Sequence, residues 1–378
     1  MTIPFNRPFI IGKELHYIAQ AVQSGQLAGD GMFTKRCHVW IEKQYSARKS
    51  LLTHSCTAAL EMAAILAEVG PGDEVILPSF TFVSTANAFA LRGAQLIFAD
   101  IRKDTFNMDE SLLPSLITPK TRAIVPVHYG GVGCEMDIIN LLAEKHGCLV
   151  IEDAAQAVNA RWNNRWLGTI GDLGCYSFHE TKNFISGEGG ALLLNADRFC
   201  ERAEIIREKG TDRSRFFRGQ VDKYSWVDIG SSYLPSEIVS AFLYAQLEQA
   251  DSISANRIAI HKRYETGLSD LIGEGRIGTQ IIPSHCDHNG HLFCILAGSL
   301  EERTRLIAYL KEQGVMSVFH YVPLHLSPMG QKYSCPVDGL PVTEYVAERL
   351  VRLPFFFGLE PDDQDRVIGL VRSFFGFN

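Results

Sequence analysis

The sequence has 378 residues and a formal net charge of −7, with 46% hydrophobic and 21% charged residues. These proportions are typical of a folded globular protein and exclude a predominantly disordered chain. The negative charge offers no general attraction to nucleic acid or to an anionic membrane, and no apolar run approaches the ~18 residues of a spanning helix. We therefore expect no nucleic-acid and no membrane partner. An anionic ligand has to be held by a local cluster of donors.

Two further features indicate the cytoplasm. The first 15 residues are interrupted by Pro4, Asn6 and Lys13, so they lack the continuous apolar core of a signal peptide. The nine cysteines are odd in number, scattered and without a CxxC motif. This usage is typical of reduced thiols, and we expect a cytoplasmic protein without disulfides.

The first 250 residues alternate short apolar runs with helical patterns. The expected strands lie at 50–54, 74–78, 95–100, 122–128, 148–153, 174–178 and 190–195. Amphipathic or small-residue helices are expected between them, for example at 57–70 and 135–147. Such alternation predicts an α/β domain of three layers, in which helices cover both faces of a mainly parallel, mixed sheet.

The pattern changes after residue 250. We expect a helix near 251–272, strands near 291–298 and 315–322, and helices at 343–352 and 361–375. This mixture predicts a smaller α+β domain over 251–378, beside a large domain over 1–250. With no flexible linker between them, the two are expected to share a rigid interface.

A carboxylate ends the apolar run 148–153. Ligands of open α/β sheets bind at the carboxyl ends of parallel strands, so Asp153 is a candidate site residue. The alternative is an N-cap for a following helix, a position at which aspartate is favoured.

Lys182 stands in a short turn between two expected strands, among aromatic and small residues. It can be a surface loop residue, as most lysines are. A partly desolvated lysine is also what a Schiff base with pyridoxal phosphate (PLP) requires. PLP enzymes pair this lysine with an acid that keeps the pyridine nitrogen protonated. Asp153, at the end of a neighbouring strand, is a candidate for that acid.

Hydroxyl-rich segments accompany this pair. The stretch 50–64 runs from a strand through Ser55 and Thr57 into a helix, whose N-terminus suits an anion such as a cofactor phosphate. Simple capping is the alternative. Ser177 is a second candidate phosphate ligand, and Phe82 is either a core residue or a face for a flat ring.

Five motifs follow one another in a specific order: SCTAAL, PSFTFVSTANA, PVHYG, EDAAQA and SFHETKN. Together with HYVPLH at 320–325, they resemble the DegT-type sugar aminotransferase family, whose fold is that of the type I PLP-dependent transferases. The resemblance runs from about Pro4 to the C-terminal helix and implies PLP as the cofactor. Within the family, residues 204–234 are most similar to the transaminases that form TDP-4-amino-4,6-dideoxygalactose for the enterobacterial common antigen, a lipopolysaccharide-related cell-surface polysaccharide.

The resemblance implies a set of cofactor-binding residues. These are Lys182 for the Schiff base, Asp153 for the pyridine nitrogen, Gln156 for the ring hydroxyl, Phe82 for the ring face, and Thr57, Ala58 and Ser177 for the phosphate. Family members usually take a further asparagine from the second subunit, within a G-x-N-Y-R pattern. Here the corresponding stretch 230–234 has Ser232 in that position, which puts this contact across the interface in question.

The resemblance also implies the reaction and its partners. A homodimer with shared sites would transfer an amino group from glutamate to a nucleotide-linked 4-keto-6-deoxyhexose, with Lys182 as general base and acid. The basic cluster over 207–223 is either a solvated face or an anion site. Candidate substrate residues are Arg215, Lys223, His320, Tyr321 and His325.

Other interpretations of the sequence need different residues. A related group of dehydratases carries histidine where Lys182 stands, and a non-catalytic sensor does not need the lysine–aspartate pair. The GxGxxG at 273–278 lacks the strand–turn–helix context of a dinucleotide site. The run 285–294, rich in histidine and cysteine, fits no established zinc pattern, so we expect no metal. The axial or equatorial configuration of the new amine and the nucleotide stay open.

Overall fold

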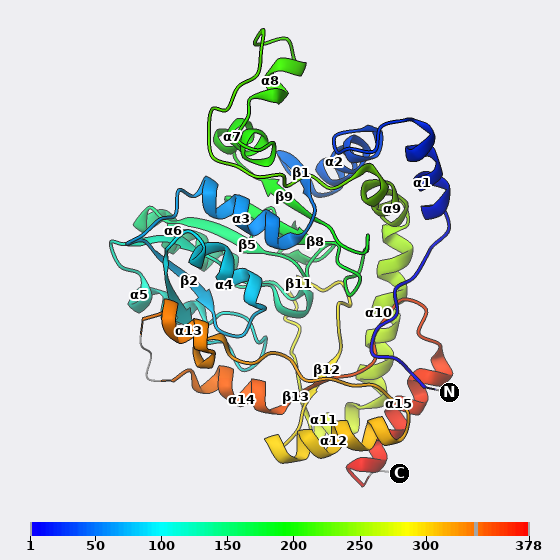
Figure 1. The fold of residues 1–378 in the computed structure, drawn as a ribbon. Coiled ribbons are helices and arrows are strands. Elements are labelled where there is room, and N and C mark those ends of the chain that lie inside the picture. The colour runs from blue at the N-terminus through cyan, green and yellow to red at the C-terminus, as the bar shows by residue number, and fades with distance from the viewer. Residues whose placement is uncertain (1, 336–338, 377–378) are drawn as a thin grey trace.

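The computed structural model describes residues 2–335 and 339–376 (Figure 1). A seven-stranded sheet forms the centre of the larger part of the molecule. In spatial order its strands are β1 (Lys49–Thr53), β9 (Gly190–Leu194), β8 (Leu173–Ser177), β5 (Leu149–Asp153), β4 (Thr121–Ile124), β2 (Glu74–Pro78) and β3 (Gln95–Ala99). The strands from β8 to β3 are parallel, whereas β9 is antiparallel to both β8 and β1. All seven expected strands are confirmed, with bounds shifted by a few residues.

Helices pack on both faces of this sheet. Successive strand residues point to opposite faces, so Leu51 lies in one core cluster and Leu52 in the other. The first cluster contains residues of α3 (Cys56–Leu66), α4 (Val83–Ala90) and α7 (Asp197–Arg207). The second contains residues of α2 (Met32–Tyr45), α6 (Met136–His146) and α9 (Glu237–Leu247). The expected three-layer α/β architecture is confirmed, and burial on both faces explains the nearly continuous apolar strand sequences.

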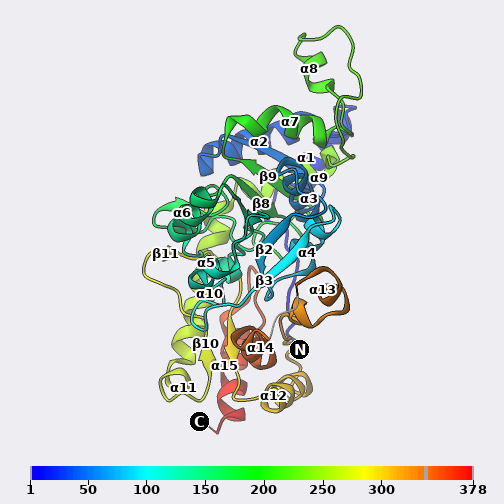
Figure 2. The same cartoon turned by 90° about the vertical axis from the view of Figure 1, so that its left-hand side faces the viewer.

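The C-terminal part contains a small antiparallel sheet with helices around it (Figures 1 and 2). Its strands, in spatial order, are β10 (Gly278–Thr279), β12 (Cys294–Leu296) and β13 (Leu350–Arg352). Its helices are α10 (Ala250–Gly267), α11 (Ser269–Gly273), α12 (Leu300–Glu312), α13 (Pro328–Tyr333), α14 (Pro341–Arg349) and α15 (Pro361–Phe374). The expected α+β character of this part is confirmed.

Three local expectations are wrong. Residues 315–322 form no strand, because Val315 and Val318 each take part in one isolated bridge and no continuous ladder develops. The helix expected over 343–352 ends at Arg349, since the next three residues pair with β12. The strand expected from residue 291 begins only at Cys294.

The remaining elements are short. They are α1 (Glu14–Gln23), α5 (Leu113–Leu116), α8 (Arg213–Phe217), the 3₁₀ turns η1 (Glu110–Leu112), η2 (Tyr129–Gly131) and η3 (Leu324–Leu326), and a three-stranded ribbon of β11 (Cys286–Asp287), β6 (Arg161–Trp162) and β7 (Arg165–Trp166). In both views α8 and its loop project from the end of the molecule opposite α12 and α15 (Figures 1 and 2).

The division of the chain at residue 250 stays a prediction. Helix α10 contributes Ile253 to a core cluster of the large sheet and Tyr264 to the core of the C-terminal part. Ile3, from the start of the chain, also packs in this second core. All nine cysteines are free, as expected. Among the described residues, no helix has the length and apolar character needed to cross a membrane.

Candidate active site

A cavity with a volume of about 740 Å³ lies where the carboxyl ends of β5 and β8 meet the C-terminal part of the chain. One wall comes from the large sheet and the helices that follow its strands. The other comes from the extended segment after α12, from residues 291–292 before β12, and from the end of β13 with the residues that follow it. Its polar lining includes Ser55, Thr57, Thr81, Ser84, Thr85, Asp153, Gln156, Ser177, Lys182, His291, His320, Tyr321 and Arg352.

Asp153 is the last residue of β5, and its side chain is buried in this cavity. Its Oδ1 accepts the backbone N–H of Ala155 at 3.1 Å within a local turn. The alternative role as a helix N-cap is wrong, because residues 154–160 form turns and no helix directly follows β5. Its Oδ2 accepts the hydroxyl of Thr85 at 2.7 Å. Among the described residues, no cation forms an ion pair with this carboxylate, which is therefore available to a protonated group of a ligand.

Lys182 lies in the turn after β8 and lines the same cavity. Burial is the main cause that lowers the pKa of its amine. Cys56 and Asp153 oppose this shift, and Arg352 adds the smallest effect, which lowers the pKa. A lowered pKa makes the neutral, nucleophilic amine accessible closer to physiological pH. The sequence-predicted pair thus shares one cavity.

The N-terminus of α3 borders the cavity. Ser55 caps this helix and accepts the backbone N–H of Ala58 at 3.1 Å, whereas the hydroxyl of Thr57 is 2.7 Å from that of Ser84. Gly190 pairs with both Thr53 and Ser177, which brings the ends of β1 and β8 together. A Cβ at this glycine would lie 2.5 Å from the first backbone nitrogen of α3, so the close approach requires glycine.

The predicted phosphate ligands are therefore not equivalent. Thr57 and Ser177 line the cavity, whereas Ala58 does not. The N–H of Ala58 already donates to the hydroxyl of the cap residue Ser55. A phosphate contact from Ala58 stays a prediction. Helix N-termini and hydroxyl groups together form a typical anion site.

Gln156, Tyr321 and Phe82 form another side of the cavity. The Oε1 of Gln156 accepts the N–H of Gly130 at 2.7 Å, and its Nε2 donates to the hydroxyl of Tyr321 at 2.9 Å. These two contacts fix the orientation of the amide. Phe82 is 58% exposed, which excludes the core alternative and leaves its ring free to cover a ligand.

The two predicted histidines have different positions. His320 lines the cavity, is held by the hydroxyl of Tyr129 at 2.9 Å, and has its pKa lowered well below the usual range by burial, so it is neutral. His325 is not among the residues that line this cavity. Its Nδ1 lies 2.7 Å from the hydroxyl of Ser79 and its Nε2 lies 3.2 Å from Glu344. His325 therefore connects β2's end to α14, and we expect no direct ligand contact from it.

Arg215, Lys223 and Ser232 are not brought to the cavity of their own chain. They belong to α8 and its flanking loops, and none of them lines the cavity. Arg215 forms a solvent-exposed ion pair with Glu201 at 2.7 Å, and Lys223 and Ser232 are exposed. Any role for them in a site requires a second subunit.

Residues 8–372 match the model of the DegT/DnrJ/EryC1/StrS aminotransferase family. The chain belongs to this family. A relative, the spore coat polysaccharide biosynthesis protein SpsC of Bacillus subtilis, is 31% identical over 98% of this chain and 96% of its own. DesV of S. venezuelae is 30% identical with a TM-score of 0.90, covering 99% of this chain and 98% of that one. Spr1654 of Streptococcus pneumoniae, in its PLP-form, is 26% identical with a TM-score of 0.92, covering 100% and 99%.

Members of the DegT/DnrJ/EryC1/StrS family are PLP-dependent sugar aminotransferases, and the chain is an enzyme of this class. Spr1654 has been solved in both PLP and PMP forms. The described residues fit this cofactor, because one cavity combines a desolvated lysine, an unpaired buried carboxylate and a helix N-terminus with hydroxyl groups. When bound, PLP supplies the electron sink that allows an amino group to pass from one substrate to another.

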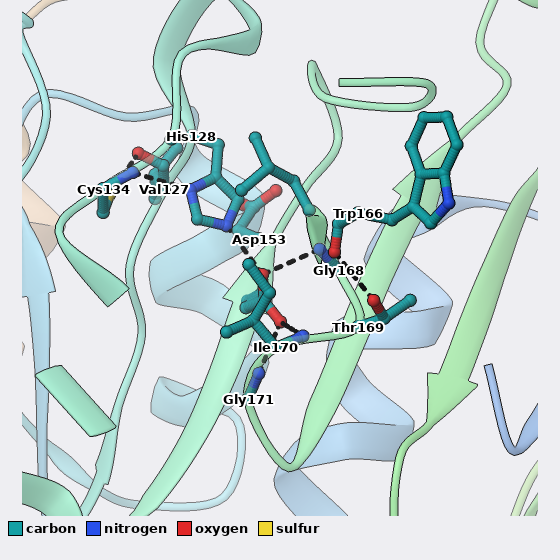
Figure 3. A network of polar contacts seen from close by, with 12 residues as sticks. Val127, His128, Cys134, Asp153, Trp166, Gly168, Thr169, Ile170 and Gly171 are labelled. Atoms are coloured by element: carbon teal, nitrogen blue, oxygen red, sulfur yellow. Dashed lines mark hydrogen bonds and ion pairs between the residues drawn. The ribbon is translucent and has the colours of Figure 1, made fainter. Parts of the chain in front are cut away.

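A network of buried polar contacts surrounds the end of β5, next to Asp153 (Figure 3). The neighbouring Glu152 accepts the backbone N–H groups of Gly168, Ile170 and Gly171 at 2.6–2.7 Å, and its Oε2 is 2.9 Å from Nε2 of His128. Nδ1 of His128 in turn accepts the N–H of Cys134 at 3.2 Å, so the proton of this ring is on Nε2. The end of β5 is therefore anchored to two adjacent loops.

Several cavity residues escaped the sequence analysis, and three of them matter most for the site. Thr85, which holds Asp153, lies in a quoted motif but was not singled out. His291 was considered only as a zinc ligand, yet it lines the cavity with its Nδ1 2.9 Å from Oδ1 of Asn183. Arg352 ends the short strand β13, whose residues were expected to be helical, so no local signal marked it.

Proposed function

We propose that this enzyme transfers the amino group of L-glutamate to TDP-4-keto-6-deoxy-D-glucose and forms TDP-4-amino-4,6-dideoxy-D-galactose for a cell-surface polysaccharide. The observation that carries the reaction is the shared cavity of Lys182 and Asp153. The proposed substrate rests on the resemblance of residues 204–234. The relation to SpsC supports a polysaccharide pathway. The same chemistry on another keto sugar nucleotide, or with the gluco epimer as product, is the alternative.

Lys182 has the central role in this proposal. Its neutral amine takes a proton from the α carbon of the donor and later returns one, as general base and acid. Burial favours this role, because it lowers the pKa of the amine. A non-catalytic sensor with this fold would have no use for such an amine.

Asp153 would keep a proton on the pyridine nitrogen of the cofactor, and Thr85 would hold the carboxylate in position for this contact. Gln156 would meet the ring hydroxyl, and Phe82 would cover one ring face. Thr57 and Ser177 would bind the phosphate. On the opposite wall, His320 and Tyr321 would line the sugar site.

We further propose a cytoplasmic homodimer in which each subunit completes the site of the other. The segment around α8 carries exposed basic residues and exposed aromatic rings, with Phe217 71% and Trp226 79% exposed. Such rings favour burial against a partner. Arg215, Lys223 and Ser232 would then reach the neighbouring cavity.

Incubation of the purified enzyme with glutamate and a panel of TDP- and UDP-linked keto sugars tests the reaction. We expect amination of TDP-4-keto-6-deoxy-D-glucose, with an axial amine in the product by NMR. Lys182→Ala should bind the cofactor without turnover, and Asp153→Asn should remain folded with most activity lost. An equatorial amine, or preference for another keto sugar, would contradict the proposed substrate. Near-normal turnover of Asp153→Asn would leave this residue only a structural role, through its contacts with Ala155 and Thr85.

Subunit complementation tests the shared site. If Lys182→Ala and Lys223→Glu homodimers are each inactive, a mixed dimer has one site with both defects and one with neither, so activity should reappear on mixing. Mass spectrometry verifies that mixed dimers have formed. If they form without recovery of activity, Lys223 does not belong to the partner's site.

A further inference from the structure

His291 lies just before β12, in the wall of the cavity that the C-terminal part provides. Its backbone is held by Arg257 of α10, whose buried guanidinium donates to the carbonyls of Gly290 and His291 at 2.9 Å and 2.7 Å. Its ring is held by Asn183, because Nδ1 of the histidine lies 2.9 Å from Oδ1 of that residue. The backbone and the ring of His291 are therefore both fixed beside the ligand space.

The contacts of Asn183 determine which nitrogen of the His291 ring carries the proton. Nδ2 of Asn183 donates to the carbonyl of Asn289 at 2.8 Å, so the amide nitrogen is engaged away from the histidine. The amide oxygen faces His291 and can only accept, which assigns the ring proton to Nδ1. Nε2 of His291 therefore carries a lone pair.

This lone pair has no donor within the described part of the chain. The amine of Lys182 does not bond to Nε2, although both residues line the same cavity. Nε2 is not enclosed by protein atoms either, because it keeps accessible surface at the cavity. Burial lowers the pKa of His291 well below its usual range, and the charges of Lys182, Arg257 and Arg352 lower it further. The cavity thus contains a fixed, uncharged acceptor.

A neutral acceptor restricts the chemistry of its ligand. The lone pair repels the oxygen atoms of a carboxylate or a phosphate, which are acceptors themselves, and it is satisfied by an O–H or N–H donor. An amino-acid substrate offers its amine, which is the group that is transferred. A nucleotide-linked keto sugar has ring hydroxyls that take no part in the transfer. A site built to bond a substrate hydroxyl also rejects analogues that lack it.

We propose that Nε2 of His291 accepts a hydrogen bond from a ring hydroxyl of the keto sugar and thereby contributes to the choice of sugar. This inference rests on the proposed function, because it assumes a hydroxyl-bearing sugar in the cavity. In that function Asp153 and Gln156 take the two hydrogen-bond donors of the cofactor ring, which leaves His291 to the sugar. Asn183 and Arg257 are positioning residues, since they act through His291.

Binding of an unreactive substrate analogue to the cofactor-loaded enzyme tests this assignment. TDP-4,6-dideoxy-D-glucose has the C2 and C3 hydroxyls of the proposed substrate but no ketone to react. Isothermal titration calorimetry gives the dissociation constants of TDP and of this analogue, and their ratio measures the contribution of the sugar. In His291→Asn the amide can still donate to Asn183, but no acceptor occupies the place of Nε2. This variant should lower the ratio about 3- to 10-fold, as expected for one neutral hydrogen bond.

Two further variants show whether the effect belongs to the acceptor. His291→Gln places an amide oxygen within reach of the position of Nε2 and should recover part of the ratio. His285→Asn is the matched control, since His285 lies 3.0 Å from Glu135 and does not line the cavity. It should leave the ratio unchanged, and TDP alone should bind equally to all variants. With either the 2-deoxy or the 3-deoxy form of the analogue, wild type and His291→Asn should give the same ratio.

An unchanged ratio in His291→Asn overturns the proposal. A loss that persists with both deoxy analogues, or that affects TDP or cofactor binding equally, indicates a distortion of the cavity and overturns it too. The same measurements with UDP and the corresponding UDP sugar separate this inference from the proposed substrate. If only the UDP pair shows a sugar contribution that His291→Asn lowers, the TDP substrate is wrong and the role of His291 stands. If the TDP keto sugar is aminated but the ratio does not change, the role of His291 fails and the proposed function stands.

Discussion

Replacing Glu152 by glutamine removes a carboxylate that is fully buried beneath the candidate active site, where His128, Gly168, Ile170 and Gly171 converge (Figure 3). Its Oε1 accepts two backbone N–H groups at 2.6 Å, and its Oε2 accepts one at 2.7 Å and the ring N–H of His128 at 2.9 Å. All four neighbours are donors. Only a group with two accepting oxygens satisfies them.

Glutamine has one oxygen, so either orientation of its amide turns an NH₂ group toward two of these donors. His128 cannot relieve the conflict by moving its proton, because its Nδ1 already accepts the N–H of Cys134. Each buried donor left without an acceptor costs about 1–3 kcal/mol. We therefore expect Glu152→Gln to lower the free energy of unfolding by about 3–5 kcal/mol, because two buried donors lose their acceptors.

Urea unfolding of the cofactor-free protein, followed by circular dichroism, measures this loss. Glu144→Gln is the control, since Glu144 is exposed on α6 and should change the free energy of unfolding by less than about 0.5 kcal/mol. A loss below about 1 kcal/mol in Glu152→Gln would refute the reasoning, because it would mean that the loop amides find other acceptors.

Three further predictions follow from the site. Thr85→Val removes the hydroxyl that holds Asp153 and should reduce kcat about tenfold at saturating cofactor; a loss below twofold in steady-state assays argues against this role. Gly190→Ala places a methyl 2.5 Å from the first nitrogen of α3 and should weaken cofactor binding in a fluorescence titration, whereas Gly70→Ala, which has open space, should not. Burial lowers the pKa of Lys182, so the unfolded chain binds more protons between that lowered pKa and the ordinary value of 10.5. The free energy of unfolding of the cofactor-free wild type should therefore rise with pH relative to that of Lys182→Met over this interval. If urea titrations give the same difference between the two proteins at every pH, the pKa of Lys182 is not lowered.

Much of the large domain could be predicted because its signals are local. The apolar runs that form the seven strands of the main sheet are buried on both faces and are therefore nearly continuous in sequence. Ser55 begins α3 because its side chain caps the helix that follows it directly. Lys182 and Asp153 were found by their chemistry at strand ends, and the structure brings them into one cavity.

The errors lie where backbone partners come from elsewhere in the chain. Residues 315–322 have the composition of a strand, but Val315 and Val318 each form one isolated bridge, to Ile3 and to Arg352. Residues 350–352 continue a helical pattern, yet they pair with β12 because that edge is available. A local sequence pattern does not show whether the edge of a distant strand is free to pair with a given segment.

The sequence by itself determined the three-layer architecture, the lysine–aspartate pair and the family to which the enzyme belongs, since periodicity and motif chemistry depend on neighbours along the chain. Only the tertiary structure decided that His320 faces the cavity while His325 turns to Ser79 and Glu344, and that Arg352 lines the same cavity as Lys182. The physical reason is that burial and charge pairing at this site depend on contacts between the large sheet and a segment that is remote from it in sequence. These contacts exist only once both parts have folded together.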